Sequence, residues 1–373
     1  MTRVLHVISG LGIGGAENML AQLVPMLQSR GFAQHVLSVT GAGPLAGLLE
    51  AANVPLTLVN MRYAGGLAAA LPQLNGTVGR FRPEVIQGWM YHGDLVATLA
   101  HWTSGGRRSR RLMWGVRCSN MDLPRHARLI RTEAWLSGWP DVIVANSASG
   151  ARTHLDHGYR PRRMEVIPNG VDTDRFRPLP AVRKEVRTHL DFADEDIVVV
   201  HVARVDPMKD HSGLLRAVDG VPGLRLLLIG KGTEQLLLPD NAIALGSRDD
   251  IPRLLPAADI AVSSSAFGEG FCNALAEGMS AGLAPVSTDV GDARLIVGDT
   301  GVIVPPGDWQ ALRRALQTLA ERGPERLRSD GLRARERIIA EFAMSRAVDR
   351  FAALYSPPKY ELSEAPALTD SQT

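Results

Sequence analysis

Short apolar runs alternate with amphipathic stretches along the chain, once before residue 168 and again after residue 196. The runs are rich in Val, Ile and Leu and predict strands, whereas stretches such as Glu17–Gln28 and Gly93–His101 repeat apolar side chains with helical spacing. Strands that alternate with helices form parallel sheets, and ligands bind outside the carboxyl ends of such strands. The pattern therefore predicts an α/β protein with two parallel-sheet domains. The predicted strands are Val4–Ser9, Val36–Thr40, Leu56–Val59, Val85–Gln87, Arg111–Trp114, Val142–Ala145, Glu165–Ile167, Ile197–Val202, Leu224–Ile229, Ile243–Leu245, Ile260–Val262, Ala284–Ser287 and Gly301–Val304.

Turn residues divide the chain near its middle. Between Pro168 and Pro180, clusters of Pro, Asn, Gly and Asp interrupt both periodic patterns. We therefore predict an N-terminal domain at residues 1–172 and a C-terminal domain at residues 173–340. A helix at residues 341–355 is expected to pack back towards the N-terminal domain, and residues 356–373 are expected to form a disordered tail.

Composition is that of an ordinary globular enzyme. Of the 373 residues, 45% are hydrophobic and 21% are charged, and the net charge of +2 gives no footprint for nucleic acid. The two cysteines, Cys118 and Cys272, lie in unrelated segments, which predicts no disulfide and fits a reducing compartment. The first strand follows the N-terminus too directly for a signal peptide, and no apolar run is long enough to span a bilayer. We expect a cytoplasmic protein, and contact with the inner face of a membrane is left open.

Two glutamates, Glu269 and Glu277, surround what the pattern predicts to be the start of a helix. The residues around and between them are too apolar for a solvated helix face. Free N–H groups in the first turn of a helix, here from Phe271 to Ala274, can hold a phosphate. A carboxylate before the helix can accept sugar hydroxyls, and one nearly two turns inside it can accept those of a ribose. Sugar, phosphate and ribose in one line describe a nucleotide-sugar.

A glycine-rich loop follows the first strand. The stretch Gly10-Leu-Gly12-Ile-Gly14-Gly15 matches the dinucleotide-binding pattern G-x-G-x-x-G. That interpretation needs an acidic residue at the end of the second strand, and none occurs before Glu50. A loop whose backbone approaches a phosphate across a cleft explains the glycines without a nicotinamide cofactor.

An Asp-x-Asp pair, Asp172 and Asp174, has a spacing that can hold a divalent cation against a diphosphate. The pair follows Pro168-Asn-Gly-Val at the predicted crossing between domains, where turn residues are expected in any case. We therefore predict that these carboxylates cap a turn, and that the protein uses no metal.

Arg204 and Lys209 follow the predicted strand Ile197–Val202 at its carboxyl end, where a ligand of an α/β protein belongs. Without a metal, these side chains can neutralise a diphosphate, because Arg204 binds phosphate oxygens as a fork and Lys209 adds a point charge. The alternative is that both side chains form surface ion pairs with Asp206 and Asp210.

The ordered set of motifs resembles the retaining glycosyltransferases of family four, which have the GT-B fold. The resemblance is strongest to bacterial members that assemble exopolysaccharides and surface glycolipids, and it covers nearly the whole chain. It implies two Rossmann-like domains that face an interdomain cleft. The segments that carry it are Gly10–Glu17, Gln87–His92, Asn146-Ser147, Ile167–Pro178, Arg204–Lys209, Glu269–Glu277 and Gly301–Asp308.

The resemblance also implies roles for single residues. Arg204 and Lys209 would bind the donor diphosphate, Glu269 the sugar hydroxyls and Glu277 the ribose. His92 would lie beside the donor sugar, although by itself it is equally a candidate core histidine. The residues whose backbone would approach phosphate are Gly14, Gly15, Gly270, Phe271, Cys272 and Asn273. Gly278 departs from the family, which usually has Ala there, and this concerns local packing only.

Retaining members of this architecture are thought to react on one face of the sugar, with the departing phosphate oxygen taking the acceptor's proton. We expect transfer of a hexose or N-acetylhexosamine from a nucleotide-sugar, with UDP favoured, to a glycan or lipid-linked acceptor and without a cofactor. Two alternatives come from other classes: a nucleotide-sugar epimerase or hydrolase on the same fold, and a nucleotide-sugar-binding protein without activity.

The N-terminal half is expected to select the acceptor. Arg117, Asn120 and Asp122 follow the strand Arg111–Trp114 and are candidates for lining the acceptor cleft, on position alone. The basic run Arg107–Arg111 is either a solvated loop or a contact with anionic lipid headgroups, where each basic residue contributes about 1 kcal/mol.

Overall fold

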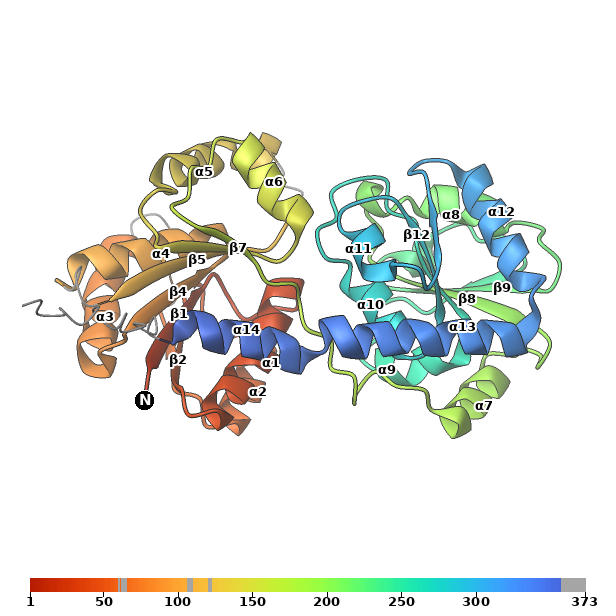
Figure 1. Ribbon diagram of the computed structural model, residues 1–373, viewed down its shortest axis with the longest axis horizontal. Coiled ribbons are helices and arrows are strands. Elements are labelled where there is room, and N and C mark those ends of the chain that lie inside the picture. The colour runs from red at the N-terminus through yellow and green to blue at the C-terminus, as the bar shows by residue number, and fades with distance from the viewer. Residues whose placement is uncertain (60, 62–65, 106–109, 120–122, 357–373) are drawn as a thin grey trace, which may run out of the picture.

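Two parallel-sheet domains lie side by side in the computed structural model, which describes residues 1–59, 61, 66–105, 110–119 and 123–356 (Figure 1). The N-terminal sheet has seven strands in the order β3-β2-β1-β4-β5-β6-β7, and the C-terminal sheet has six in the order β10-β9-β8-β11-β12-β13. All strands predicted from the sequence are present, with ends shifted by at most three residues. They are β1 Arg3–Ile8, β2 Ala33–Ser38, β3 Leu56–Leu58, β4 Val85–Trp89, β5 Arg111–Val116, β6 Val142–Ala145, β7 Met164–Val166, β8 Ile197–Val202, β9 Leu224–Ile229, β10 Ala242–Ala244, β11 Ile260–Ser263, β12 Ala284–Thr288 and β13 Val302–Val304.

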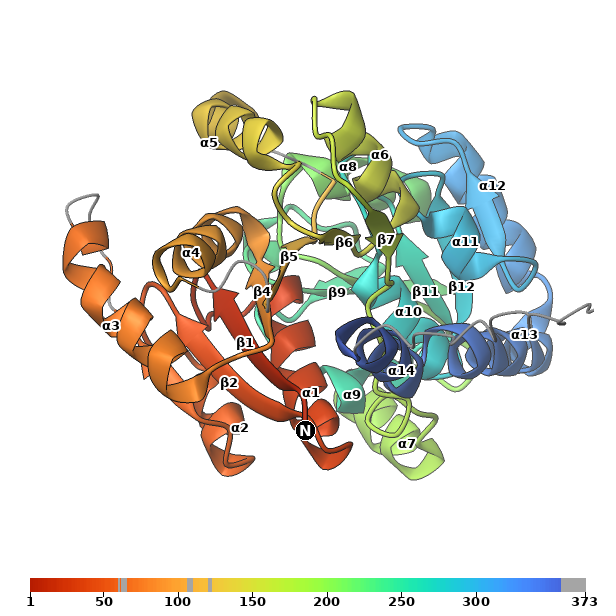
Figure 2. The same cartoon turned by 60° about the vertical axis from the view of Figure 1, so that its left-hand side comes forward.

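Helices connect the strands and cover both faces of each sheet (Figures 1 and 2). Those of the N-terminal half are α1 Gly15–Ser29, α2 Ala46–Ala51, α3 Gly66–Phe81, α4 Met90–Thr103, α5 Leu123–Leu136 and α6 Ala148–Asp156. Those that follow are α7 Pro180–His189, α8 His211–Val218, α9 Ile251–Leu254, α10 Asn273–Ser280, α11 Ala293–Val297, α12 Trp309–Ala320, α13 Gly323–Arg337 and α14 Met344–Tyr355. None of the helices in the described part of the chain is long and apolar enough to cross a membrane.

The chain passes between the domains twice, and the two crossings are paired. The Val171 amide donates to the Phe342 carbonyl at 2.8 Å, and the Met344 amide donates to the Val171 carbonyl at 2.8 Å. A Cβ atom on Gly170 would lie 2.5 Å from the Met344 Cα, so only glycine allows the crossings to pack this closely. The pairing places the hinge between the domains at these residues.

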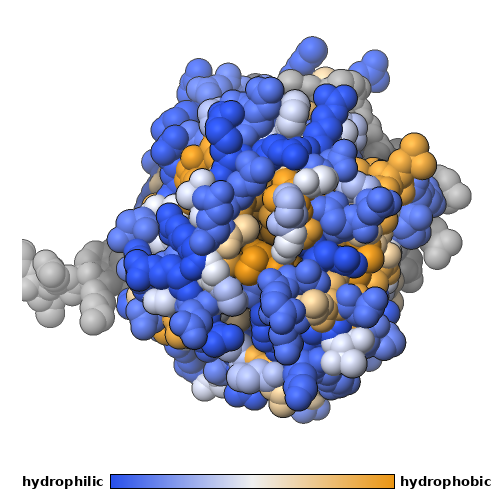
Figure 3. All heavy atoms as spheres, turned by 90° about the vertical axis from the view of Figure 1, so that its right-hand side faces the viewer, coloured by the Kyte–Doolittle hydropathy of each residue, from blue (hydrophilic) through white to orange (hydrophobic). Residues whose placement is uncertain are grey.

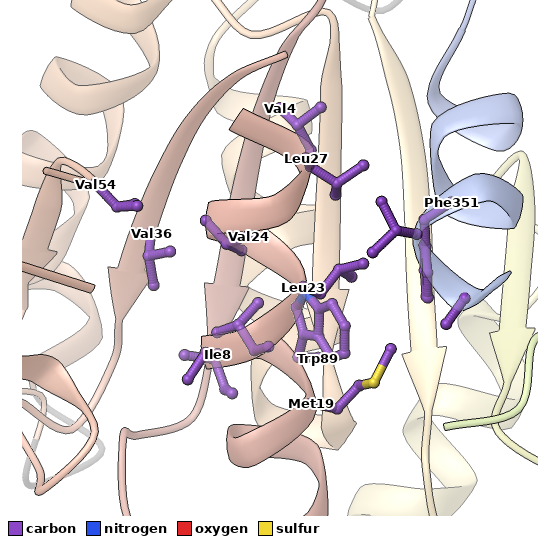
Figure 4. Packing of buried hydrophobic residues seen from close by; sticks show 14 of the residues in the cluster. Val4, Ile8, Met19, Leu23, Val24, Leu27, Val36, Val54, Trp89 and Phe351 are labelled. Atoms are coloured by element: carbon purple, nitrogen blue, oxygen red, sulfur yellow. The ribbon is translucent and has the colours of Figure 1, made fainter. Parts of the chain in front are cut away.

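The last helix, α14, packs on the N-terminal domain, whereas α13 lies along the C-terminal domain (Figure 1). Phe351 of α14 stacks on Trp89 of β4 with ring centroids 6.0 Å apart, and both are fully buried in one cluster with side chains of α1 (Figure 4). This burial attaches the end of the described chain to the N-terminal core. The predicted tail beyond Ser356 lies outside the described residues.

The outer end of the C-terminal domain is mostly hydrophilic, with hydrophobic residues in small groups among polar ones (Figure 3). Scattered exposed apolar side chains are normal for a globular surface. In parallel α/β sheets, ligands bind outside the carboxyl ends of the strands.

Candidate functional site

The loop after β8 presents Lys209 from a tight turn. The Asp206 carboxylate accepts a hydrogen bond from the Met208 amide at 3.0 Å and caps a 3-10 turn at Pro207–Lys209. Asp210 follows with φ of +45°, and its carboxylate accepts from the Gly213 amide at 3.0 Å, which caps α8. Two caps in succession thus fix the backbone on both sides of the lysine.

Lys209 forms a short ion pair with Glu269, with side-chain exposures of 17% and 10%. The Ser265 hydroxyl donates to the same carboxylate oxygen at 2.5 Å. Burial disfavours the charged lysine, but the neighbouring Cys272 and Glu269 outweigh it, so the pKa of Lys209 lies above its ordinary value. The pair brings the predicted phosphate cation and the predicted sugar carboxylate into direct contact.

Arg204 behaves differently from Lys209. Its guanidinium is largely exposed and binds the Asp206 carboxylate at 2.9 and 3.2 Å. The surface pairing considered as the alternative is therefore present for Arg204, and the alternative pairing of Lys209 with Asp210 is not. The Met208 amide, with help from Arg204, holds the pKa of Asp206 below its usual range.

Helix α10 starts at Asn273, with Cys272 as the extended residue before it. Glu277 therefore lies little more than one turn into the helix, and the expectation of nearly two turns was wrong because the stretch after Glu269 is extended. The Phe271 and Cys272 side chains are buried in the C-terminal core, and burial raises the pKa of the Cys272 thiol. Within the described part of the chain, the backbone amides from Gly270 to Asn273 have no protein acceptor. This segment thus offers backbone donors and no reactive side chain.

Glu277 is partly buried, and its carboxylate has no hydrogen-bond or ion-pair partner among the described residues. Burial raises its pKa to about 7, and the nearby Arg175 opposes that shift. A carboxylate in this state has room for a hydroxyl ligand. The adjacent Gly278 is explained by packing, since its Cβ would lie 2.5 Å from the Ala261 Cβ on β11.

The start of α1 faces the start of α10 across the domain boundary. Gly14 precedes α1 in an extended conformation, and Gly15 is its first residue. A Cβ atom on Gly15 would lie 3.2 Å from the Asn273 amide nitrogen, Nδ2. The starts of the two helices therefore approach each other, with the Glu17 carboxylate beside Gly14 at the start of α1. The amides at the start of α10 favour an anionic ligand there.

His92 lies in the first turn of α4 and is exposed. Strand β4 passes into α4 without a loop. At the junction Met90 has φ of +62°, and this left-handed conformation costs on the order of 1–3 kcal/mol for a residue other than glycine. Partial burial and the nearby His126 lower the pKa of His92, so the imidazole is mostly neutral at pH 7. The strained junction projects a neutral imidazole at the carboxyl edge of the N-terminal sheet.

Arg117 does not line an open acceptor cleft, in contrast to the expectation from its position. Its side chain is buried, its guanidinium lies 5.0 Å from the centroid of the Trp89 ring, and its Nη2 donates to the Asn169 side-chain oxygen. Burial lowers its pKa to about 10. Asn120 and Asp122, proposed beside it, lie outside the described residues, as do residues 107–109 of the basic run.

Asn169 continues this contact into the other domain, because its Nδ2 donates to the Asn273 side-chain oxygen at 2.8 Å. A polar chain of Arg117, Asn169 and Asn273 thus links the N-terminal core to the first residue of α10. No local pattern predicts this chain of contacts, apart from the turn motif Pro-Asn-Gly that contains Asn169.

Asp172 caps a turn, as predicted. Its carboxylate accepts from the amides of Asp174 and Arg175 at 3.2 and 3.0 Å. Among the described residues, no group of three or more His, Cys, Asp or Glu side chains is arranged to hold a metal ion.

Models of two glycosyltransferase families match the chain in succession. One, described as Glycosyltransferase Family 4, matches residues 13–175, and the other, Glycosyl transferases group 1, matches residues 196–322. The two halves of the chain belong to these two families of glycosyltransferase domains. The first matched range contains β2 to β7 of the N-terminal sheet, and the second contains all six strands of the C-terminal sheet. The site described above lies where the two sheets meet.

Relatives and solved structures agree with this membership. The putative glycosyltransferase EpsD of Bacillus subtilis is 29% identical over 60% of this chain and 62% of its own length, so the chain spans less than two thirds of that relative. A D-inositol 3-phosphate glycosyltransferase of Geodermatophilus obscurus is 35% identical over 60% of this chain and 54% of its own. The structure of Anabaena Alr3699/HepE with UDP and glucose has a TM-score of 0.81 at 22% identity, covering 95% and 99% of the two chains. The fold of the chain is therefore GT-B.

Proposed function

We propose that this glycosyltransferase is a retaining enzyme that transfers a hexose or N-acetylhexosamine from a UDP-sugar to a glycan or lipid-linked acceptor in surface-polysaccharide synthesis. One observation carries the proposal: Lys209 and Glu269 form a pair beside the unpaired amides of Gly270 to Asn273, with the unpartnered Glu277 one turn further on. The lysine and the backbone amides suit the diphosphate of a nucleotide-sugar. The two carboxylates on either side of them suit the hydroxyl groups of its sugar and its ribose.

Each group has a task in this proposal. Lys209, Arg204 and the amides at the start of α10 neutralise the diphosphate as it departs, which is the kind of preorganised electrostatic stabilisation that dominates many enzymes. Glu269 accepts hydroxyl groups of the transferred sugar, and Glu277 accepts those of the ribose. Gly14 and Gly15 let the start of α1 approach the phosphates from the other domain.

The transfer itself proceeds on one face of the sugar. The acceptor hydroxyl attacks the anomeric carbon from the side on which the bond to phosphate breaks, and its proton passes to the departing phosphate oxygen. No protein carboxylate is needed as nucleophile, and the neutral imidazole of His92 stands beside the sugar. Closure of the two domains excludes water, so that transfer outruns hydrolysis.

The named relatives support the choice of donor and acceptor. HepE was solved with UDP and glucose, and a relative from Mycobacterium leprae, 28% identical over 91% of this chain and 89% of its own, is a phosphatidyl-myo-inositol mannosyltransferase. A lipid-linked acceptor would bring the enzyme to the inner face of the cytoplasmic membrane, in line with a cytoplasmic protein in peripheral contact with it.

Product analysis tests the reaction type. The enzyme is incubated with a panel of UDP-, GDP- and ADP-sugars and an oligosaccharide or lipid-linked acceptor, and the anomeric configuration of the new linkage is read by NMR. We expect the α configuration of the donor to be kept and UDP-sugars to be used best. An inverted linkage or a clear preference for GDP or ADP would contradict the proposal. Isomerised or hydrolysed donor without transfer would favour the epimerase or hydrolase, and tight donor binding without turnover the binding protein.

Chelation tests the absence of a metal from the reaction. Because Lys209, Arg204 and the α10 amides supply the positive charge, transfer should continue at an unchanged rate in EDTA. Complete loss that is restored by Mg²⁺ or Mn²⁺ would instead promote Asp172 and Asp174 to metal ligands. Their substitution by Ala would then have to abolish the restored activity.

A further inference from the structure

Asp292 stands at a helix start but does not cap its own helix. It is the residue directly before α11, and its side chain makes no hydrogen bond to that helix. Instead its two carboxylate oxygens accept from the amides of Ala148 and Ser149 at 2.8 and 2.9 Å. These are the first two residues of α6 in the other domain, and Asp292 is buried.

The carboxylate completes the capping of α6 across the domain boundary. Ser147 is the cap within the domain, and its hydroxyl accepts from the Gly150 amide at 2.9 Å. The amides of Ala148 and Ser149, the first two residues of α6, have no acceptor within the helix. The Asp292 carboxylate of the C-terminal domain accepts their hydrogen bonds. The negative charge also lies at the positive end of the helix dipole. This contact therefore stabilises the arrangement in which the two domains are together.

The same turn is joined to the donor loop. The Asp292 amide donates to the Gly270 carbonyl at 3.0 Å. Gly291 has φ of +64°, and a Cβ atom there would lie 2.5 Å from the Glu269 carbonyl oxygen. A Cβ atom on Gly270 would in turn lie 2.8 Å from the Ser147 hydroxyl. A displacement of the loop that carries Glu269 must consequently move Asp292 against α6.

We propose that Asp292 is a positioning residue that couples the donor loop to the acceptor domain by exchanging between two helix starts. With the domains together it caps α6, as seen here. When they separate, its carboxylate is released to the amides of Arg294 and Leu295, the groups that an Asp before a helix normally caps. One set of hydrogen bonds replaces the other, so the two arrangements stay close in free energy, and a ligand on the Gly270 loop can shift their populations.

Two substitutions weaken the contact from opposite sides. Asp292→Ala deletes the acceptor. Ala148→Pro deletes one of the two donors and leaves Asp292 with the hydrogen bond from the Ser149 amide. Proline is tolerated at the first position of a helix, and Ser147 before it already has φ of −160° and ψ of 153°, the region that a following proline requires. Asp289→Ala is the matched control, because Asp289 belongs to the same loop but pairs with Arg294 in its own domain.

Small-angle X-ray scattering with and without UDP reports domain separation, and it does so whatever sugar or acceptor the enzyme uses. From the usual effect of losing a helix cap, Ala148→Pro should reduce the ratio of closed to open molecules by roughly 2- to 30-fold, whereas Asp292→Ala removes the hydrogen bonds of both arrangements and should shift the ratio less. In Ala148→Pro the fraction of donor lost to hydrolysis should rise as transfer falls, and the double variant should scatter like Asp292→Ala, because the proline has no acceptor left to affect. Asp289→Ala should match the wild type.

The proposal is overturned if Ala148→Pro scatters like the wild type with unchanged partition between transfer and hydrolysis. It is also overturned if Ala148→Pro opens the protein equally when residue 292 is Ala, or if Asp289→Ala reproduces the effect of Ala148→Pro. Should Asp292→Ala fail to fold, Ala148→Pro carries the test alone. Because closure is read without turnover, an enzyme that opens as expected but uses no UDP-sugar would refute the proposed reaction and not this contact.

Discussion

Lys209→Ala should lower the turnover number by about 100- to 1000-fold, the effect expected when one preorganised charge at a leaving group is removed. The loss should appear in kcat with the donor at saturation, because the lysine acts most strongly on the charge that develops as the diphosphate departs. Arg204→Ala should lower kcat in the same direction, since its exposed guanidinium is free to leave Asp206 for a phosphate. Initial rates at varied donor concentration measure both.

The buried ion pair between Lys209 and Glu269 means that Lys209→Ala also changes the stability of the fold. Removing Lys209 leaves Glu269 without its partner, and an uncompensated buried charge costs roughly 3–5 kcal/mol before allowance for partial solvent contact. Chemical denaturation should therefore show a lower free energy of unfolding for Lys209→Ala. The double variant Lys209→Ala/Glu269→Ala should regain part of that stability but none of the turnover. Lys184→Ala, on the exposed face of α7, should change neither quantity. Near-normal turnover in Lys209→Ala would remove this loop from the phosphate site.

The architecture was predictable because its signals are local. Runs such as Ile197–Val202 and Leu224–Ile229 are apolar throughout, as strands buried on both faces must be, and turn residues separate them from the helices. The placement of Arg204 and Lys209 at the carboxyl end of β8 followed from the same rule. Only the exact start of α10 was misjudged, because the stretch between Glu269 and Asn273 has no periodicity to reveal that it is extended.

Contacts between distant segments were not predictable. Lys209 and Glu269 are 60 positions apart, and nothing local distinguishes their pairing from the surface pairing that Arg204 adopts. Arg117 was assigned to the acceptor cleft because it follows a strand, but Trp89 and Asn169 enclose it. Asp292 directly precedes α11, but the amides that donate to its carboxylate lie in the other domain. Contacts of this kind depend on which segments the tertiary fold brings together, so local sequence patterns do not predict them. In this protein many of them lie along the domain boundary.

Nucleotide binding should tighten as the pH rises through about 7, and Glu277 is the reason. In the free protein burial raises the pKa of this carboxyl to about 7, so it is largely protonated below that pH. In the proposed binding mode the ribose hydroxyls donate to the ionised carboxylate, so that binding there must release a proton. The dissociation constant for UDP should therefore fall by up to about tenfold per pH unit as the pH rises from about 5 to 7, and level off above. Calorimetric titrations across this range measure it.

Glu277→Gln separates this effect from the titration of the UDP phosphate itself. The variant should lose the slope due to the carboxyl and, at pH 8, bind UDP more weakly by roughly 1–3 kcal/mol, because an amide is a poorer acceptor for two hydroxyls. Uridine, which has no phosphate, should reproduce the difference between the two proteins. An equal slope in both would exclude Glu277 as the ribose carboxylate.

The contribution of Glu277 to the free energy of unfolding should change with pH in the direction opposite to its contribution to nucleotide affinity. The folded-state pKa of Glu277 lies above the ordinary value of 4.5, so its contribution to stability is complete below that value and is lost as the pH rises to about 7. Without nucleotide, Glu277→Gln should therefore be more stable than the wild type at pH 8 and no more stable at pH 4.5, as measured by denaturation at each pH. A carboxylate that lowers the stability of the free protein and strengthens its complex is what a ligand-binding group requires, whereas a structural glutamate would destabilise the fold when replaced. Loss of stability in Glu277→Gln at pH 8 would place Glu277 among the structural groups.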